Sequence, residues 1–369
     1  MKIVFLASYP QSLINFRLSL MKEFIKKGHE VVAIAPHEPA VANELLNHKI
    51  KYIPLHLERN GINPLADIKL IFSLWKILKK ERPHSIFSYT IKPVIYGSIS
   101  AKLARVPSIY SMITGTGYVF LDNNFKSRIV GLIARNLFRF ALYFNHLIFF
   151  QNQDNLEFFR HKKIISYKKP VVIVNGSGVD CNQFTPSDYP AEISFLMIAR
   201  FLHDKGIREY YEAAKIIKKR YPYVNFKLVG WIDTNPNSIT QNELNNWIND
   251  NTINYLGKLS DVRDAIAASS VYVLPSYHEG TPRTVLEAMA MARPIITTNA
   301  PGCKETVIDA NNGFLVPVKN IEKLSEKIEY FILHPEKIPI MGTVSRQLAL
   351  DKYDVNKVNK KILTNMGID

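Results

Sequence analysis

The sequence predicts an α/β fold built from two Rossmann-like domains. Short buried strands alternate with amphipathic helices along the chain, which is the pattern of a parallel sheet covered by helices. The alternation restarts after residue 190, and 369 residues with 47% hydrophobic content can form two ordinary cores. We therefore expect one domain at 1–180, a second at 190–343, and a helical stretch at 344–369 that crosses back to the first domain.

Short apolar runs rich in Val, Ile and Phe mark the expected strands. In the first domain these runs are 2–7, 30–35, 50–54, 85–89, 108–112, 147–151 and 171–174. In the second they are 194–199, 225–230, 253–256, 270–275, 294–298 and 313–316. Helical patterns lie between them, such as Leu18–Lys27 before Gly28 and Leu65–Lys80 before Pro83. A Pro-containing polar segment at 176–192 is the expected linker.

Composition excludes several classes of protein. The two cysteines, Cys181 and Cys303, give neither a disulfide framework nor a metal-ligand spacing. No run of about eighteen apolar residues occurs, and Met1–Ser8 is too short for the apolar part of a signal peptide. We expect a protein of the reducing cytosol that does not span a membrane.

The net charge of +15 is concentrated in one half of the chain. Residues 1–180 contain 25 Lys/Arg and 11 Asp/Glu, giving +14, whereas 181–369 contain 22 and 21, giving +1. This asymmetry indicates an anionic partner of the first half, such as a membrane surface, a phosphorylated substrate or nucleic acid, with a solubilising surface as the alternative. The absence of an RNA-recognition or interleaved basic-aromatic motif argues against nucleic acid.

The segment from His278 to Glu287 places two carboxylates eight positions apart around a Gly-x-Pro turn. A strand pattern precedes the turn and a helix pattern follows it, so Glu279 is expected in the loop at the strand's carboxyl end, where open α/β sheets bind ligands. Glu287, on the helix, can accept hydrogen bonds from both hydroxyls of a ribose. Two solvated glutamates are the alternative, but the strand-loop-helix context favours a sugar-nucleotide site.

A second group of polar residues follows the strand at 194–199. Arg200 and Lys205 can converge on a diphosphate, the guanidinium as a fork and the ammonium as a point charge. Gly206 opens a helix whose N-terminus adds backbone donors. Ordinary loop cations are the alternative. Gly230 and Gly257, which also end strands, let the backbone approach a base closely or form plain turns.

Together these residues resemble the nucleotide-binding half of retaining glycosyltransferases of family 4, which have the GT-B fold of two domains facing each other across a cleft. The resemblance implies that Arg200 and Lys205 hold the donor diphosphate, that Glu279 faces the donor sugar and that Glu287 holds the ribose. It further implies that Gly257 and Lys258 present backbone to the base. Gly280, Thr281 and Pro282 then belong to the loop that binds the donor. At Ala292 the family usually has glycine, and alanine there costs on the order of 1 kcal/mol if the position needs a positive φ.

Two further segments look like those of family members that extend undecaprenyl-diphosphate-linked sugars. They are Pro301–Glu305 and the Phe-Arg motif within Asn15–Leu20. This resemblance implies a UDP-sugar donor and a lipid-linked glycan acceptor. The chain departs from the family on the acceptor side, after the first and fifth strands, at 8–12 and 113–117. Its candidate residues are Arg17, Thr114, Gly115 and Gly117.

The predicted function is transfer of a hexose or N-acetylhexosamine, with retention, to a lipid-linked acceptor in surface polysaccharide or glycoprotein glycan synthesis. Breaking the anomeric bond releases a diphosphate, and fixed cations stabilise the charge that develops on it. We expect no cofactor and no metal, since the chain has no Asp-x-Asp or histidine cluster. The alternative is a non-transferring enzyme of the same fold, such as a UDP-sugar epimerase.

We expect the basic first domain to dock on an anionic membrane surface, at the inner face of the cell membrane. On a helical wheel, Arg128, Arg135 and Arg139 fall within about 40° of one another, opposite an apolar side that includes Ile133 and Phe140. The segment Leu65–Lys80 likewise combines cations with aromatic residues, namely Lys69, Lys76 and Lys80 with Phe72 and Trp75. A core helix with a solvated cationic face is the alternative.

Overall fold

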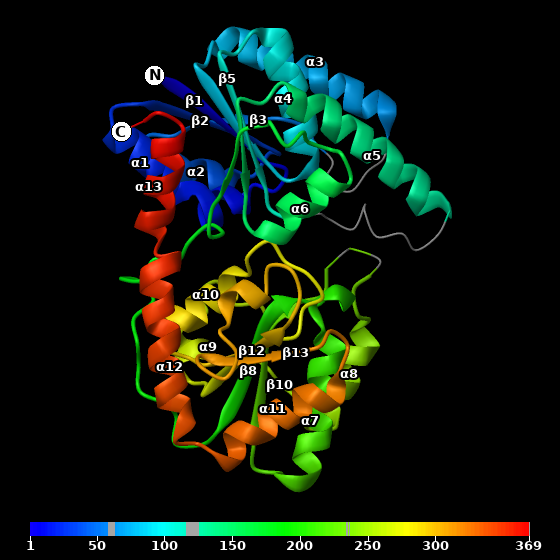
Figure 1. Ribbon diagram of the computed structural model, residues 1–369, viewed down its shortest axis with the longest axis vertical. Coiled ribbons are helices and arrows are strands. Elements are labelled where there is room, and N and C mark those ends of the chain that lie inside the picture. Colours follow the sequence, from blue (N-terminus) through cyan, green and yellow to red (C-terminus); the bar gives the residue numbers. More distant parts are fainter. Residues whose placement is uncertain (58–62, 116–124, 234, 236, 369) are drawn as a thin grey trace. The chain divides into compact units, whose positions relative to one another are not determined.

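The chain folds into two parallel-sheet α/β units. The computed structural model describes residues 1–57, 63–115, 125–233, 235 and 237–368, with the side chains of 125–130 outside this description (Figure 1). Contacts divide the chain into Met1–Ser177 with Asn359–Asp369, and Gly178–Val358. The predicted α/β class with two parallel-sheet domains is confirmed.

Seven parallel strands form the sheet of the first unit, in the order β3-β2-β1-β4-β5-β6-β7. The strands are β1 (Lys2–Leu6), β2 (Glu30–Ala35), β3 (Lys51–Pro54), β4 (Ser85–Tyr89), β5 (Ser108–Ile113), β6 (Leu147–Phe150) and β7 (Val171–Ile173). The helices are α1 (Leu18–Lys26), α2 (Pro39–Asn47), α3 (Pro64–Glu81), α4 (Ile91–Ala104), α5 (Phe125–Tyr143) and α6 (Gln153–His161), with a π-helical turn at Leu13–Arg17.

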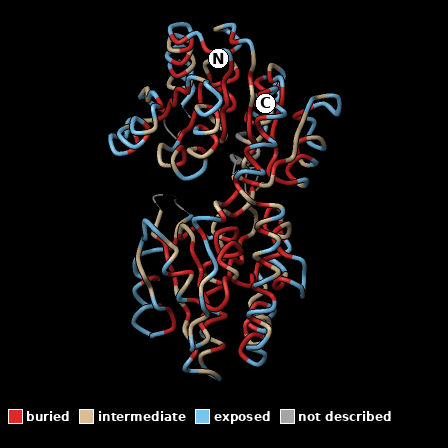
Figure 2. Tube along the Cα trace, turned by 90° about the vertical axis from the view of Figure 1, so that its left-hand side faces the viewer, coloured by how far each residue is buried: buried red, intermediate tan, exposed pale blue. Residues whose placement is uncertain are grey.

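Alternation along β1 separates the two helical layers of this unit. Val4 and Leu6 belong to a buried cluster that includes Leu74 of α3 and Val94 of α4. Phe5, between them, points to the other face, where its ring meets Phe24 of α1 at 5.7 Å between centroids. Figure 2 shows the buried residues concentrated in the interior of each unit. The helices α3, α4 and α5 pack side by side on the first of these faces.

Six parallel strands form the sheet of the second unit, in the order β10-β9-β8-β11-β12-β13. The strands are β8 (Ser194–Arg200), β9 (Asn225–Trp231), β10 (Asn254–Tyr255), β11 (Val271–Leu274), β12 (Ile295–Thr298) and β13 (Gly313–Val316). The helices are α7 (Ile207–Arg220), α8 (Gln241–Asn249), α9 (Arg263–Ala267), α10 (Arg283–Ala290), α11 (Ile321–Leu333) and α12 (Lys337–Leu348), with 3₁₀ turns at His203–Lys205 and Lys304–Thr306.

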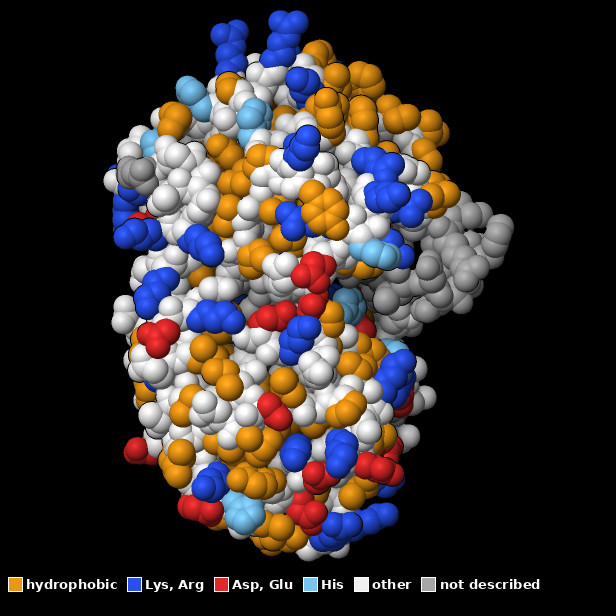
Figure 3. Space-filling view, in the orientation of Figure 1, with side chains coloured by type: hydrophobic (Ala, Val, Ile, Leu, Met, Phe, Trp, Pro, Cys, Tyr) orange, Lys and Arg blue, Asp and Glu red, His pale blue; other side chains and the backbone are white. Residues whose placement is uncertain are grey.

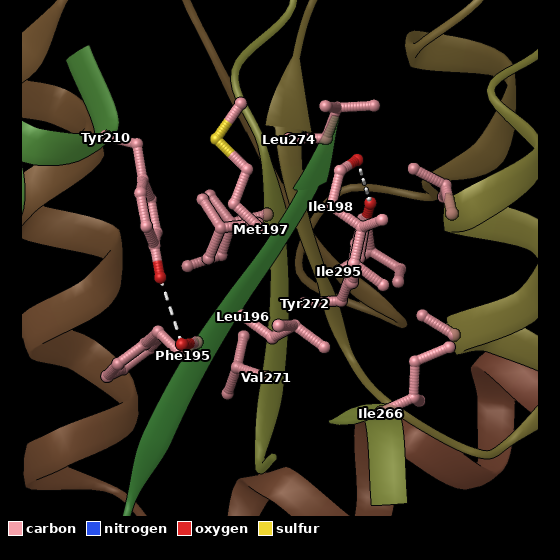
Figure 4. Packing of buried hydrophobic residues seen from close by; sticks show 14 of the residues in the cluster. Phe195, Leu196, Met197, Ile198, Tyr210, Ile266, Val271, Tyr272, Leu274 and Ile295 are labelled. Carbon is pink, nitrogen blue, oxygen red and sulfur yellow. Dashed lines mark hydrogen bonds between the residues drawn. The ribbon is translucent and has the colours of Figure 1, made fainter. Parts of the chain in front are cut away.

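Two buried tyrosines form hydrogen bonds to the backbone of β8, a central strand of the second sheet (Figure 4). Tyr210 donates its hydroxyl to the Phe195 carbonyl at 2.9 Å. Tyr272 donates to the Ile198 carbonyl at 3.1 Å and lies 2.6 Å from the Thr284 hydroxyl. A buried hydroxyl without a partner is costly, so both tyrosines keep these bonds. The bonds hold the backbone of β8 in place from Phe195 to Ile198, just before Arg200.

The carboxyl-terminal stretch 344–369 contains the end of α12, a π-helical turn at Ala349–Tyr353, and α13 (Val355–Asn365). The division between the units falls inside α13, because the chain up to Val358 packs in the second unit and Asn359 onward packs in the first. There the Asn359 side chain donates to Ser19 Oγ at 2.9 Å. Among the described residues no helix is long and apolar enough to cross a bilayer.

Ala292 has the positive φ considered above, +58°, just after the end of α10. We expect Ala292→Gly to stabilise the protein by about 0.5–1 kcal/mol, because glycine adopts this conformation without the steric cost that alanine carries. The same replacement at Ala288, inside α10, should destabilise it by about 1 kcal/mol or more. Urea unfolding of both variants measures the difference, and an equal loss in both would contradict the assigned strain.

Candidate functional site

The strand order of the second sheet reverses between β8 and β11. From β8 the chain moves outward to β9 and β10, then returns to pair β11 on the other side of β8. Loops leaving the carboxyl ends of two such strands diverge, which is where open α/β sheets bind ligands. The loop after β8 carries Lys205, and the loop after β11 carries Ser276 to Pro282.

The structure brings Lys205 and Glu279 into direct contact at this point. Lys205 Nζ lies 2.6 Å from Glu279 Oε1, with only 15% and 18% of the two side chains exposed. Ser276 Oγ donates to the same oxygen at 3.1 Å. Burial alone would lower the pKa of Lys205, but the charges of Glu279 and Asp204 outweigh it and raise that pKa. A protonated ammonium is therefore held beside a carboxylate at the switch point.

Two glycines allow these loops to pack so closely. Gly206 has φ +71°, and a Cβ there would lie 2.1 Å from the Pro275 carbonyl oxygen. Gly302 has φ +82°, and its Cβ would lie 2.2 Å from the Glu279 carbonyl oxygen. The Glu279 amide in turn donates to the Pro301 carbonyl at 2.8 Å. The Pro301–Glu305 segment thus supports the loop that presents Glu279.

Cys303, next in this segment, is fully buried, with its thiol 4.0 Å from the Ser276 carbonyl. Burial raises the pKa of its thiol to about 12. A thiol that stays protonated is a poor nucleophile, so Cys303 acts here as a small packing residue.

Arg200, at the end of β8, forms an ion pair that the sequence analysis missed. Its Nη1 lies 2.9 Å from Asp233 Oδ2. The position of this pair at the ends of two neighbouring strands is the signal that could have predicted it. The strands β8 and β9 run parallel with Arg200 opposite Trp231, and Asp233 follows Trp231 by two residues. The charge of Arg200 also acts on Lys205, which places the two cations in one electrostatic neighbourhood.

Glu287 lies on α10, with 9% of its side chain exposed and Oε1 2.8 Å from Arg283 Nε. Burial raises the pKa of Glu287, against the charge and hydrogen bond of Arg283, which lower it. The spacing of Arg283 and Glu287, one helical turn apart, is the signal that could have predicted this pair. Both Glu279 and Glu287 act electrostatically on buried Tyr272, so the two carboxylates share one region of the unit.

The remaining donor-side candidates lie in turns around this region. Gly257 has φ +77°, and its carbonyl accepts from the Gly230 amide at 2.9 Å. Lys258 Nζ lies 4.8 Å from the centroid of the Trp231 ring. Thr281 Oγ1 donates to the Gly280 carbonyl at 2.9 Å, and Pro282 is the N-cap of α10. Within the described residues no three His, Cys, Asp or Glu side chains gather as a metal site would require.

The first-unit candidates lie at the carboxyl edge of the first sheet. Arg17 is only 2% exposed, and its guanidinium donates to Met112 Sδ and to Ser177 Oγ and lies over the Tyr89 ring. Thr114 and Gly115, both partly exposed, follow the end of β5. Gly117 lies outside the described residues.

Two parallel-sheet α/β units, with paired cations and carboxylates at the switch point of the second, agree with the GT-B class of glycosyltransferases that the sequence resembles. Residues 2–152 match the family described as glycosyl transferase 4-like, and residues 183–347 match glycosyl transferases group 1. The chain belongs to this glycosyltransferase family, and it is an enzyme that transfers glycosyl groups.

Relatives cover most of the chain. The N,N'-diacetylbacillosaminyl-diphospho-undecaprenol alpha-1,3-N-acetylgalactosaminyltransferase of Campylobacter jejuni is 30% identical, over 98% of this chain and 97% of its own. The UDP-Gal:alpha-D-GlcNAc-diphosphoundecaprenol alpha-1,3-galactosyltransferase of Escherichia coli is 29% identical, over 82% and 80%. Anabaena Alr3699/HepE, solved with UDP and glucose, shares the fold, with a TM-score of 0.81 and 19% identity over 100% and 99%. These matches do not favour the epimerase alternative.

We expect Glu287→Gln to make the protein more stable than wild type at pH 7 but not at pH 4. A carboxyl whose pKa is raised in the folded state costs stability as the pH rises through its ordinary value of 4.5, and glutamine removes this cost. Urea unfolding at both pH values tests it. Glu326→Gln on α11 is the control of opposite sign, because Lys323 and Lys327 lower the pKa of Glu326. A parallel response of the two variants would contradict the assigned burial effect.

Proposed function

We propose that the enzyme transfers a hexose or N-acetylhexosamine, with retention, from a UDP-sugar to a polyprenyl-diphosphate-linked glycan in surface polysaccharide or glycoprotein glycan synthesis. The Lys205–Glu279 pair at the switch point of the second sheet is the observation that carries the proposal. The names of the relatives support it, since one specifies a UDP-sugar donor and both specify an undecaprenyl-diphosphate-linked acceptor.

Donor binding in this proposal is an exchange of ionic partners. Arg200 and Lys205, paired with Asp233 and Glu279 in the structure, turn to the donor diphosphate. Glu279 then accepts from a hydroxyl of the donor sugar, and Glu287 accepts from the ribose. Gly257 and Lys258 present backbone to the base, and Gly280, Thr281 and Pro282 close around the sugar-diphosphate. Because each cation already has a carboxylate partner, it is held at the switch point before the donor arrives and changes only its partner.

The chemistry follows from where charge develops. As the bond between the anomeric carbon and the diphosphate oxygen breaks, positive charge grows on the sugar and negative charge on the leaving diphosphate. Arg200 and Lys205 stabilise the diphosphate, so we propose that no metal or other cofactor is required. The acceptor hydroxyl attacks the face that the diphosphate leaves and gives its proton to the departing diphosphate oxygen, so retention yields an α-linkage. Arg17, Thr114, Gly115 and Gly117 remain the proposed acceptor residues, with Arg17 acting through the Tyr89 ring that it covers.

A surface over α3 and α5 is the proposed contact with the anionic membrane that holds the acceptor. Ile133 and Phe140, expected opposite the cations of α5, are 54% and 55% exposed, while Phe138 and Ala134 face the core. Apolar and cationic side chains therefore share the exposed side, as Figure 3 shows over these helices. The α3–α5 surface comprises Leu65, Ile68, Lys69, Phe72, Lys76, Leu132, Ile133, Arg139, Phe140 and Tyr143.

Exposed apolar side chains interleaved with cations fit the headgroup region of an anionic bilayer better than water, because the rings and aliphatic chains are buried there while the charges meet phosphates. The net charge of residues 1–180, +14, is positive like the cations of the α3–α5 surface and is attracted to the same anionic bilayer. We therefore propose a cytoplasmic enzyme, peripheral at the inner face of the cell membrane, with no nucleic-acid partner.

Lys205→Ala and Glu279→Ala should each lower turnover by at least about 100-fold, because each removes a partner of the transition state. Glu287→Gln should act mainly on affinity and weaken UDP binding, since the amide lacks the charge and one acceptor. The control is Lys323→Ala, which removes the exposed Lys323–Glu326 pair and should leave turnover unchanged. Transfer to a prenyl-diphosphate-linked N-acetylhexosamine is the assay. Near-wild-type rates in both alanine variants would overturn the proposed site.

Replacing Lys69, Phe72 and Lys76 together by Ser should weaken binding to phosphatidylglycerol vesicles by about 30-fold or more, since each cation near an anionic leaflet contributes about 1 kcal/mol. Binding should also fall as salt screens the charges. The control is Lys360→Ser with Lys361→Ser, which removes the same charge from exposed positions of α13. Co-sedimentation measures both variants. Equal losses in the two, or no binding of the wild type at low salt, would contradict the proposed surface.

A further inference from the structure

Thr90 adopts a backbone conformation that is normally found only for glycine. Its φ is +69° and its ψ is 165°, a region that is essentially restricted to glycine and that a β-branched side chain enters only under constraint. Arg82 and Arg105 also have positive φ, but with ψ of 53° and 38° they occupy the ordinary left-handed region at the ends of α3 and α4. Thr90 instead stands before a helix, at the start of α4.

This residue lies at the switch point of the first sheet. The order β3-β2-β1-β4-β5 reverses between β1 and β4, which run parallel with Leu6 opposite Ser88. Ser8 and Thr90 each follow two residues later, and their hydroxyl oxygens lie 2.9 Å apart. The position corresponds to the β8–β11 switch point, where the second unit holds Lys205 and Glu279.

The surrounding contacts hold the strained backbone in place. Tyr89, the preceding residue, is 2% exposed, and its hydroxyl lies 2.9 Å from Ser12 Oγ. The Arg17 guanidinium covers its ring, 4.8 Å from the centroid. The Thr90 carbonyl accepts from the Val94 amide at 3.0 Å, which starts α4. Strain persists where neighbours fix a residue in this way, and such residues cluster at ligand sites.

Neither the backbone conformation nor the capping of α4 requires a threonine at position 90. Beside its own switch point the second unit meets the need for positive φ with Gly206 and Gly302. Thr90 makes no capping bond to α4 with its side chain, so its hydroxyl does not serve the helix either. The side chain is partly exposed, and Tyr9 in the neighbouring loop is 40% exposed. A hydroxyl both donates and accepts, which suits it to the hydroxyls of a neutral saccharide.

We infer that Thr90 is an acceptor-binding residue: its hydroxyl, which also pairs with the Ser8 hydroxyl, binds a hydroxyl of the acceptor saccharide. This inference rests on the proposed transfer to a lipid-linked glycan and adds to it the residue that recognises the sugar. The strained backbone sets the direction of the hydroxyl, which a relaxed residue at the same place would not reproduce.

Three variants separate the hydroxyl from the strain. Thr90→Ser keeps the hydroxyl and should retain transfer within about threefold. Thr90→Ala and Thr90→Gly should each lower kcat/KM for the acceptor by about tenfold or more, with UDP affinity and UDP-sugar hydrolysis unchanged. Since glycine releases the strain that alanine retains, Thr90→Gly should melt about 2 °C or more above Thr90→Ala. The matched control is Lys49→Gly, at φ +60° beside the amino end of β3, which should leave the acceptor KM unchanged.

Hydrogen exchange of the wild type with a short-chain prenyl-diphosphate-linked N-acetylglucosamine completes the test. We expect the ligand to protect segments 8–12 and 89–94. Protection there without transfer would reject the proposed reaction and leave the assigned binding site standing. Transfer without protection, wild-type kinetics of Thr90→Ala, a Thr90→Gly variant less stable than Thr90→Ala, or an equal loss of UDP affinity would each overturn the role of Thr90.

Discussion

The reversal of strand order beside the first strand of each sheet is the constraint on which the rest of the structure depends. A parallel sheet must return its chain by crossovers, and where two crossovers leave in opposite directions their loops separate at the carboxyl edge. In the second unit this opening lies between β8 and β11, and in the first between β1 and β4. The residues proposed for the site gather at both openings, where diverging loops leave room for a ligand.

Charge inside the second opening is tolerated because it is paired. An isolated buried ammonium or carboxylate would lose too much solvation, whereas Lys205 and Glu279 neutralise each other, and Arg200 with Asp233 and Arg283 with Glu287 do the same. Such pairs are poor sources of stability but good devices for holding groups in position. In the proposed donor complex, a diphosphate that replaces the carboxylates meets cations that are already held at the switch point.

The two openings solve the problem of close loops differently. Gly206 and Gly302 let backbone approach backbone in the second unit, at 2.1 and 2.2 Å for the Cβ atoms that they lack. The first unit places threonine in a conformation of the same glycine-only kind and clamps it through Tyr89, Ser12 and Arg17. A glycine supplies room, whereas a strained threonine supplies a directed hydroxyl.

The sequence by itself determined the helices and strands and the α/β fold class, because the spacing of apolar residues along the chain shows which face of each element is buried. It predicted every strand position of both sheets to within a few residues, and it predicted that Glu279 lies in a loop and Glu287 on a helix. The positive φ of Ala292 was raised as a condition by the family resemblance alone, since the family usually has glycine there, and the structure shows it.

Only the tertiary structure decided which side chains meet. Lys205 and Glu279 are 74 positions apart, and Arg200 and Asp233 are 33 apart, so no local period links them. The exposed side of α5 was likewise set by its neighbours, because a helical wheel gives angles but not the face that the sheet covers. The burial of Arg17 and the backbone of Thr90 have the same cause. Both are imposed by contacts among β1, β4 and β5, which exist only once the strands have been brought together.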